Sequence, residues 1–314
     1  MTYDILICGA GQLGSRYLQG ISKLKFDYNV YVYDISQKSI ERAKERWSHV
    51  KKNRFFKEIF FIKNFDIIPK KIDFVIVSSL SSVRLENVKC INKITSVNYW
   101  ILEKVLAQNE SQIKKIKSLI YKSKGSWVNT PRREMSWYNF IKSKINVNNK
   151  IKIEIKGGRW GLLSNAIHFI DLASWITKKK LTRIDSSNLE SKWFESKRKG
   201  FYETYGLISC EFENGSILNI DCKNDDSPLF INIYEKDYSW EISEINGKAV
   251  RSDGLKIEGK IEMQSEITQK IITKIIETGD CSLPKLLESS KMHTIYLNNL
   301  LLNNNIYKNI LPIT

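Results

Sequence analysis

Residues Tyr3–Gly14 read YDILICGAGQLG, and this segment is the strongest indication of the fold of the N-terminal third of the chain. An apolar run ends at Cys8 and passes directly into Gly9, Gly11 and Gly14, which are spaced as G-x-G-x-x-G. An amphipathic segment follows, so the pattern predicts a strand, a glycine turn and a helix. In that setting Gly9 permits a tight turn, Gly11 lets the backbone approach a pyrophosphate, and Gly14 lets the helix pack on the strand. The stretch therefore predicts a dinucleotide-binding turn.

A second strand carries the acidic residue that accompanies such a turn. Residues Asn29–Tyr33 alternate in polarity and end at Asp34, roughly 20 positions beyond the glycines. A carboxylate there holds the ribose hydroxyls of an adenosine and repels a 2′-phosphate, so NAD is favoured over NADP. The alternative is that Asp34 caps the helix predicted in the next segment, SQKSIERAKERW. The phosphates are expected at the N-terminus of the first helix, beside Gln12 and Leu13, where free N–H groups and the helix dipole favour anions.

Three further strand patterns continue the alternation of strands and helices. They lie at Ile59–Ile62, Phe74–Val77 and Tyr99–Leu102. This repeated β-α-β order predicts an α/β domain, a Rossmann dinucleotide-binding domain with a doubly wound parallel sheet, over residues 1–125. Polar residues that follow two of these strands are expected to line the ligand crevice at the carboxyl edge of the sheet. They are Ser78, Ser79, Glu103 and Lys104.

The second half has a different pattern, with many alternating segments. Alternating runs recur from Lys150 onward, and Asn214-Gly215 between two of them is a strong signal for a hairpin turn. Helices are expected at Glu110–Lys122, Ala166–Ile176, Gln264–Glu277 and Leu283–Leu302, and a polar loop at Asp185–Glu195. Half-buried strands with apolar helices predict an α+β domain, residues 126–314, with an open, mainly antiparallel sheet. We expect this domain to bind the substrate and to form oligomers.

The motifs together resemble those of one enzyme family. The order GAGQLG, YD, VIVSS and LEK is similar to that of the glucose–fructose oxidoreductase, inositol dehydrogenase and rhizopine-catabolism (Gfo/Idh/MocA) family. The family's Glu-Lys-Pro signature stands here as Glu-Lys-Val at positions 103–105. In the second half, the apolar helix resembles the family's D-x-x-x-H-x-x-D helix, with Ser164 at the first aspartate position and His168 and Asp171 retained.

The resemblance implies that Lys104 transfers a proton to or from a substrate hydroxyl. It also implies that His168 assists this transfer or positions the hydroxyl, as a group able to donate or accept a hydrogen bond. From the residues alone, the alternatives are that Lys104 is a surface lysine and that His168 is a hydrogen-bonded histidine of the core. The resemblance also implies that Ser164, at the family's aspartate position, contacts the substrate. We further expect Glu103 to contact the cofactor, and Asn165 and Arg132 to contact the substrate. Arg132 either binds an anionic group of the substrate or points into solvent.

Composition argues against several other classes. The formal net charge is +16, but the lysines are spread along the chain without a basic helix or an aromatic RNA-binding signature. We therefore expect no nucleic-acid partner, and we interpret the positive field as attracting an anionic cofactor. Five scattered cysteines without a CxxC pair and three isolated histidines match no disulfide framework or metal site, so buried or half-buried free thiols are expected. No apolar run is long enough for a membrane span and no leader pattern precedes the first strand, so a cytoplasmic protein is expected.

These observations favour an NAD-dependent dehydrogenase or ketoreductase that acts on a sugar, a cyclitol or a nucleotide-linked sugar. A role in surface-polysaccharide synthesis is a narrower hypothesis. A non-catalytic NAD(H)-binding sensor or scaffold is the alternative, and an enzyme that uses tightly bound NAD as a transient redox catalyst is a second. An open sheet often buries one face by pairing subunits, so a homo-oligomer, a dimer or a tetramer, is expected.

Overall fold

The computed structural model describes residues 1–304 and 306–314. The chain divides into two compact units, each of which is described by itself. Unit 1 comprises Met1–Ala107, Ser111–Glu134 and Glu262–Leu287. Unit 2 comprises Gln108–Glu110, Met135–Ile261 and Glu288–Thr314.

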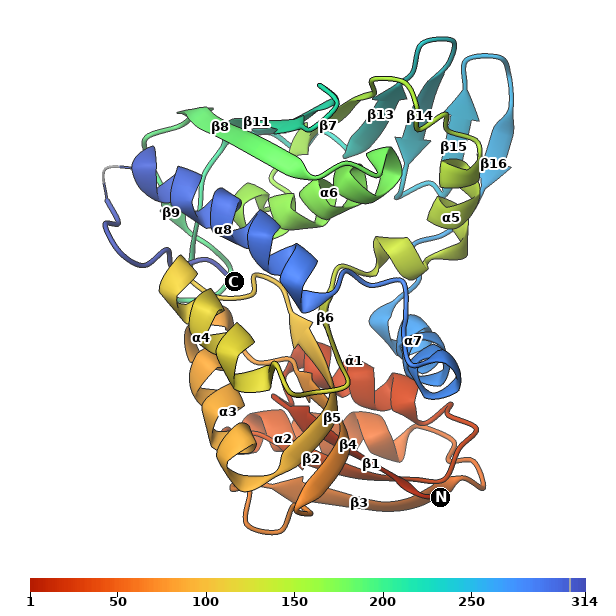
Figure 1. Cartoon of the computed structure of the whole chain (residues 1–314), viewed down its shortest axis with the longest axis vertical. Coiled ribbons are helices and arrows are strands. Elements are labelled where there is room, and N and C mark those ends of the chain that lie inside the picture. The colour runs from red at the N-terminus through yellow and green to blue at the C-terminus, as the bar shows by residue number, and fades with distance from the viewer. Residues whose placement is uncertain (305) are drawn as a thin grey trace. The chain divides into compact units, whose positions relative to one another are not determined.

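Unit 1 is built on a six-stranded parallel sheet in the order β3-β2-β1-β4-β5-β6 (Figure 1). Its strands are β1 (Tyr3–Cys8), β2 (Tyr28–Tyr33), β3 (Phe56–Ile62), β4 (Lys71–Val77), β5 (Ser96–Glu103) and β6 (Gly125–Asn129). Its helices are α1 (Gln12–Ile21), α2 (Gln37–Ser48), α3 (Ser81–Ile94), α4 (Glu110–Ile120), the 3-10 helix η1 (Pro131–Glu134) and α7 (Gln264–Thr278). The strand order reverses between β1 and β4, which is the switch point where such sheets bind ligands. The doubly wound parallel sheet predicted from the sequence is thus confirmed.

The central strands of this sheet are apolar because helices cover both of its faces. Ile5, Leu6 and Ile7 of β1 have no exposed surface. The carboxyl ends of neighbouring strands lie in register, since Cys8 pairs with Val77 and Val77 pairs with Leu102. The segments after β1, β4 and β5 therefore start from one edge of the sheet.

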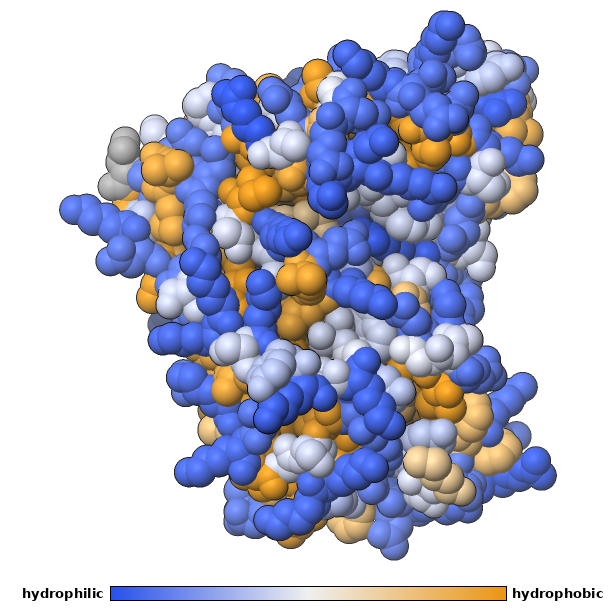
Figure 2. Space-filling view, in the orientation of Figure 1, coloured by the Kyte–Doolittle hydropathy of each residue, from blue (hydrophilic) through white to orange (hydrophobic). Residues whose placement is uncertain are grey.

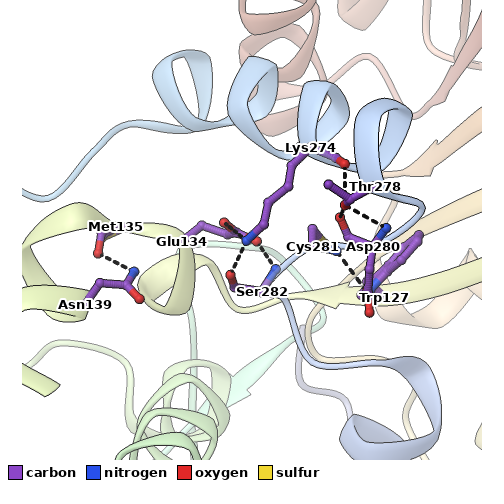
Figure 3. Close-up of polar contacts among 9 residues, drawn as sticks. All are labelled: Trp127, Glu134, Met135, Asn139, Lys274, Thr278, Asp280, Cys281 and Ser282. Atoms are coloured by element: carbon purple, nitrogen blue, oxygen red, sulfur yellow. Dashed lines mark hydrogen bonds and ion pairs between the residues drawn. The ribbon is translucent and has the colours of Figure 1, made fainter. Parts of the chain in front are cut away.

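The chain that follows α7 covers the outer edge of β6. The N–H of Val128 donates to the carbonyl of Pro284 at 3.0 Å, and the indole N–H of Trp127 donates to Asp280 Oδ1 at 3.0 Å (Figure 3). Because β6 pairs in parallel with β5 and this segment closes its free edge, residues 126–134 and 262–287 pack with unit 1. The domain boundary expected near residue 125 does not coincide with this division.

Unit 2 contains an eight-stranded sheet in the order β16-β15-β14-β13-β7-β12-β11-β8 and a two-stranded sheet of β9 and β10. The strands are β7 (Lys152–Gly158), β8 (Leu181–Leu189), β9 (Phe194–Glu195), β10 (Tyr202–Glu203), β11 (Gly206–Phe212), β12 (Ile217–Lys223), β13 (Phe230–Tyr234), β14 (Ser239–Ser243), β15 (Lys248–Arg251) and β16 (Lys256–Glu258). The helices are α5 (Ser136–Ser143), α6 (Leu162–Thr177) and α8 (Leu286–Leu302). Within the described residues, β7 and β12 are the only parallel neighbours of the large sheet, so the predicted mainly antiparallel sheet is confirmed.

Two local expectations in unit 2 have different outcomes. The hairpin predicted at Asn214-Gly215 is confirmed, because β11 and β12 pair in antiparallel around it and Gly215 has a φ of +77°. The expected loop at Asp185–Glu195 is wrong in part, since β8 runs through its first half and β9 lies at its end. Polar residues such as Ser187 and Asn188 are compatible with a strand here because both are exposed, at an irregularity in the pairing of the edge strand β8 with β11.

The two faces of the large sheet differ in polarity. Figure 1 shows α6 and α8 on one face of this sheet, and Ile153 and Ile155 of β7 are buried. The opposite face of β7 carries Lys152, Glu154 and Lys156, and both lysines pair with Glu154, at 2.7 and 2.6 Å.

Hydrophilic residues cover most of the face seen in Figure 2, with hydrophobic residues in separate patches. In the described part of the chain, no helix has the length and apolarity needed to cross a membrane. All five cysteines are unpaired thiols; contrary to expectation, Cys90 is exposed, because it lies on the outer side of α3.

Candidate dinucleotide site and substrate helix

The glycine turn has the geometry of a cradle for a dinucleotide phosphate. Gly9 has a φ of +108°, and a Cβ added to it would lie 2.8 Å from the backbone nitrogen of Ser79. A Cβ on Gly14 would lie 1.7 Å from the carbonyl oxygen of Gly9. A Cβ on Gly11 would meet no described heavy atom within 4 Å. The first and third glycines are therefore required by packing, whereas Gly11 borders open space at the N-terminus of α1, where a pyrophosphate fits.

Asp34 links the end of β2 to this turn. Its Oδ2 accepts the N–H of Ala10 at 2.8 Å and its Oδ1 accepts the N–H of Ser36 at 2.8 Å. The capping of α2 is done by Ser36, whose hydroxyl oxygen accepts the N–H of Ser39 at 3.3 Å. The alternative of Asp34 as the helix cap is thus wrong, and its half-exposed carboxylate lies beside the glycine turn.

Gln12 and Leu13 form the first turn of α1, with Gln12 exposed and Leu13 half-buried. The guanidinium of Arg46, on α2, donates to the carbonyl of Gln12 at 3.0 Å and to its side-chain oxygen. It also donates to the hydroxyl of Ser15. A cation beside this turn adds to the positive end of the helix dipole. Sequence reasoning missed Arg46, because the only signal is a charged residue on a long amphipathic helix.

Ser78 and Ser79 follow β4 and lie against the same turn. The N–H of Ser78 donates to Cys8 O at 2.9 Å and its hydroxyl donates to Gly9 O at 2.7 Å. The hydroxyl of Ser79 accepts the side-chain N–H of Asn87 at 2.9 Å. Both serines are half-buried. They hold the glycine turn in place and lie at the edge where the cofactor was expected.

Glu103, the expected cofactor contact at the end of β5, is buried inside unit 1. It is 3% exposed, and its Oε1 accepts the hydroxyl of Tyr17 at 2.5 Å and the side-chain N–H of Asn129 at 2.7 Å. Burial raises the pKa of Glu103, while these two donors and the nearby cations Arg84 and Lys104 oppose the rise. The carboxyl group joins α1, β5 and β6 from inside unit 1.

Lys104 is half-buried at the carboxyl end of β5, and the Lys104–Val105 peptide bond is cis. The backbone after it is held by Arg84 of α3, which is 1% exposed. The Arg84 guanidinium donates to Val105 O, to Leu106 O at 3.1 Å and to Ser79 O at 2.5 Å. One buried cation therefore ties the segments after β4 and β5 together. In the sequence, Arg84 is recognisable only as a single arginine among the apolar positions of α3.

In unit 2, α6 carries the predicted substrate residues. Ser164 is half-buried in its first turn, and its hydroxyl donates to Glu203. His168 is also half-buried and lies one turn further along the same helix face. Asp171 is 1% exposed. The side-chain amide of Asn165 donates to Trp160 O at 2.9 Å, so it holds the loop before the helix.

Arg132 belongs to unit 1, in η1, three residues beyond the end of β6, and is half-buried. Its neighbour Arg133 is buried, with 6% of its surface exposed. The expected catalytic pair is divided between the units, because Lys104 lies in unit 1 and His168 in unit 2.

No protein-family model matches the sequence, and no curated protein matches it in sequence. Solved structures match nearly the whole chain. UDP-N-acetylglucosamine 3-dehydrogenase GnnA from Acidithiobacillus ferrooxidans is 10% identical with a TM-score of 0.71, over 95% of this chain and 96% of that chain. The scyllo-inositol dehydrogenase from Lactobacillus casei, solved with NAD(H) and scyllo-inositol, is 14% identical with a TM-score of 0.67, over 97% of each chain. The transcriptional regulator Gal80p from Kluyveromyces lactis is 16% identical with a TM-score of 0.70, over 96% of this chain and 92% of that chain.

The sheet order and the glycine turn define a two-unit protein whose unit 1 has a Rossmann fold. More particularly, the chain has the fold of the Gfo/Idh/MocA oxidoreductases that its sequence resembles. The expected resemblance is confirmed at the level of the fold. Because a transcriptional regulator shares this fold, the fold by itself does not decide between an enzyme and a regulator.

Proposed function

We propose that the protein is an NAD-dependent oxidoreductase that transfers a hydride to or from a ring carbon of a sugar, a cyclitol or a nucleotide-linked sugar. The glycine cradle carries this proposal, because Gly9 and Gly14 are closely packed while the space beside Gly11 is open. Asp34 at the end of β2 favours NAD, since its carboxylate would repel a 2′-phosphate. A bound nicotinamide would supply the hydride donor or acceptor.

Lys104 is the residue proposed to move the proton of the substrate hydroxyl. Its position after β5 is fixed by the Arg84 contacts to Val105 and Leu106, and a lysine ammonium group can donate or, once neutral, accept a proton. His168 is proposed to assist as a donor or acceptor. Ser164, Asn165 and Arg132 are proposed contacts of the substrate.

The substrate class is supported by the dehydrogenases that share the fold, which act on UDP-N-acetylglucosamine and on scyllo-inositol. Both compounds carry secondary hydroxyl groups on a polar ring. A role in surface-polysaccharide synthesis, a cytoplasmic location and a homo-oligomeric state belong to the same proposal.

The test is isothermal titration of NADH and NADPH, together with a turnover screen over keto-sugars, cyclitols and nucleotide sugars. Lys104→Ala should bind NADH as wild type does and should turn over no substrate. Lys104→Arg is the matched control, because it keeps the charge but does not release a proton. Gly11→Ala should fold normally, since its φ of −64° suits alanine, but should bind NADH at least about tenfold more weakly. Equal NADH affinity in Gly11→Ala and wild type would contradict the cradle.

A non-catalytic NAD(H)-binding sensor is the second candidate, favoured by the likeness to a transcriptional regulator. It predicts tight NADH binding, no hydride exchange with any compound of the screen, and recovery of a partner protein in a pull-down. Cofactor that stays bound through purification and turnover without net reduction would instead indicate transient redox chemistry.

A further inference from the structure

A short hairpin of unit 2, formed by β9 and β10, lies against the first turn of α6. Strand β10 ends at Glu203, which is 6% exposed and whose Oε2 accepts the N–H of Leu163 at 2.6 Å. Its Oε1 accepts the N–H of Ser164 at 3.1 Å. Because Leu163 and Ser164 lie in the first turn of α6, the hairpin is fixed beside the helix that carries proposed substrate contacts.

The register of the hairpin determines which side chains share a face with Glu203. Glu203 pairs with Phe194, and Tyr202 pairs with Glu195. Paired residues of antiparallel strands lie on the same face and successive residues on opposite faces, so Phe194 lies on the α6 side. The ring centroids of Phe194 and Tyr205 are 4.7 Å apart, and both residues are half-buried. The face that meets α6 therefore carries a pair of partly accessible aromatic rings.

The opposite face of the hairpin packs against the C-terminal segment. The ring centroid of Tyr307 lies 5.6 Å from that of Tyr202 and 5.5 Å from that of Trp193. The N–H of Tyr202 donates to Pro312 O at 2.8 Å. A ligand that also reaches α6 therefore meets the hairpin on the face of Phe194.

Three consecutive cations form the tip of the hairpin. Lys197, Arg198 and Lys199 are exposed, and within the described part of the chain none of them has an ion-pair partner. The loop that carries them is closed by the N–H of Gly200, which donates to Glu195 Oε1 at 2.6 Å. Like charges side by side repel one another and attract an anion. The tip is therefore suited to a phosphate-bearing ligand.

Aromatic rings beside cations are the combination that a nucleotide requires, because the base stacks on a ring while the cations neutralise its phosphates. Proteins that bind a single-stranded nucleic acid use a groove that follows several nucleotides. Here each strand of the hairpin has two residues, which is about 7 Å of strand. The hairpin thus offers room for one nucleotide and not for a polynucleotide.

We propose that the β9–β10 hairpin binds the nucleoside diphosphate of a nucleotide-linked substrate, with the base on Phe194 and Tyr205 and the phosphates at Lys197, Arg198 and Lys199. This proposal rests on the proposed function and selects the nucleotide-linked sugar from the three substrate classes named there. Binding of the nucleotide would hold the sugar ring beside α6 without contact to the reacting carbon.

The test is calorimetric titration of the whole chain saturated with NADH, so that a diphosphate does not enter the glycine turn. The probes are UDP-N-acetylglucosamine, N-acetylglucosamine, UDP, GDP and inorganic pyrophosphate. UDP or GDP should bind at least about tenfold more tightly than pyrophosphate, because only these two carry a base that stacks. UDP-N-acetylglucosamine should bind more tightly than N-acetylglucosamine, and added salt should weaken the binding of UDP.

A triple variant tests the cations. Replacing Lys197, Arg198 and Lys199 together by glutamine should weaken UDP binding roughly tenfold and should reduce its dependence on salt. The matched control removes two lysines and one arginine at exposed positions of unit 1: Lys51, Lys52 and Arg54. This control should leave both the affinity and the salt dependence unchanged, since it removes the same charge at a distant site.

Substitutions of Phe194 test the stacking. Phe194→Leu keeps an apolar side chain but removes the ring, so it should weaken UDP binding roughly tenfold and leave pyrophosphate binding unchanged. Phe194→Trp keeps a ring and should retain the affinity for UDP. Tyr202→Leu is the control, because the ring of Tyr202 contacts Tyr307 on the opposite face.

Two results would overturn the proposal: binding of neither UDP nor GDP more tightly than pyrophosphate, or hairpin variants that bind UDP as their controls do. A single-stranded oligonucleotide or phosphatidylserine vesicles that bind more tightly than UDP, and lose this binding in the triple variant, would also overturn it. The hairpin would then belong to a nucleic-acid or a membrane contact.

The proposed function is tested separately by the NADH titration. A chain that binds UDP through the hairpin but does not bind NADH would refute the oxidoreductase and leave the hairpin site intact. In that case the titrations are made without NADH, and equal UDP affinity in Gly11→Ala shows that UDP does not bind at the glycine turn. A chain that binds NADH but neither UDP nor GDP would keep the oxidoreductase and refute the hairpin site.

Discussion

Glu103 is a carboxyl group with almost no access to solvent, and two neutral donors, Tyr17 and Asn129, share its Oε1 atom. Asn129 also donates to Gln264 at 2.8 Å, which extends the network to α7. Burial raises the pKa of Tyr17 well above its usual value, and the adjacent Glu103 raises it further. The hydroxyl of Tyr17 therefore keeps its proton in the folded chain. The residue next to Lys104 serves the site by fixing the elements around it.

The raised pKa of Glu103 predicts a pH dependence of stability. The folded chain keeps the Glu103 proton to a higher pH than the unfolded chain, whose glutamate titrates near the ordinary 4.5. Between these two pKa values the folded state binds more protons, so the free energy of unfolding falls as the pH rises. Glu103→Gln does not titrate and should remove this fall, as measured by urea unfolding from pH 4.5 upward. Tyr17→Phe, which removes a donor that lowers the pKa of Glu103, should extend the fall to higher pH; parallel profiles for all three proteins would refute this account.

At the scale of elements, the loop ends of unit 1 are joined by buried side chains. Arg84 connects the segments after β4 and β5, as described above. Near the edge of β6, Glu134 of η1 accepts the N–H of Ser282 and lies 3.8 Å from the ammonium group of Lys274, as Figure 3 shows. The same ammonium group donates to the Ser282 hydroxyl at 2.6 Å. These side-chain contacts hold the backbone segments that carry Lys104 and Arg132.

Replacing Arg84 should be among the most destabilising changes in unit 1. Arg84→Met leaves the carbonyl groups of Val105, Leu106 and Ser79 without this donor, and we expect a loss of about 3 kcal/mol in the free energy of unfolding. Urea unfolding measures the loss, and NADH titration under folding conditions should show weaker binding because Ser79 lies at the glycine turn. Lys89→Met on the same helix is the control, since its exposed ion pair with Glu86 contributes little. A loss for Arg84→Met no larger than for this control would refute the role.

The elements that could be predicted from the sequence are those with strong local patterns. The apolar run of β1 and the spacing of the glycines are enough to predict the strand, the turn and the helix. The alternating polarity of β2 is enough to predict that Asp34 lies at the end of a strand. The residues that could not be predicted act over long distances along the chain. Glu203 lies 39 positions from Ser164 and Tyr17 lies 86 from Glu103. No periodicity encodes such pairs, because they depend on how the strands are ordered in the sheet.

A second limit on sequence reasoning is the ambiguity of polar segments. The first half of the expected loop at Asp185–Glu195 is polar in sequence, yet it pairs as β8 with β11. An exposed strand and a loop can have the same amino-acid composition. Only pairing with a partner strand distinguishes the two. Helix α6 was predicted because its apolar pattern is local, whereas the contact of its first turn with Glu203 was not.

At the scale of the whole molecule, the outer face of the large sheet in unit 2 is suited to self-association. Asn219, Glu154 and Asn232 lie in one register row across β12, β7 and β13. Hydrogen bonds from Lys152 and Lys156 hold the pKa of Glu154 below its usual value, although burial opposes this, so the central charge of the row is compensated. A row of paired charges and amides can face its own copy across a two-fold axis without an unpaired ion.

We therefore expect light scattering after size exclusion to give at least twice the 36.6 kDa mass of the chain. Asn219→Arg places an uncompensated cation in the centre of this face, opposite the same cation of the second copy, and should shift the mass toward that of the single chain. Gln37→Arg adds the same charge at an exposed position on α2 and should leave the mass unchanged. A single-chain mass for wild type would refute the oligomer, and an unchanged oligomer in Asn219→Arg would place the interface on another surface.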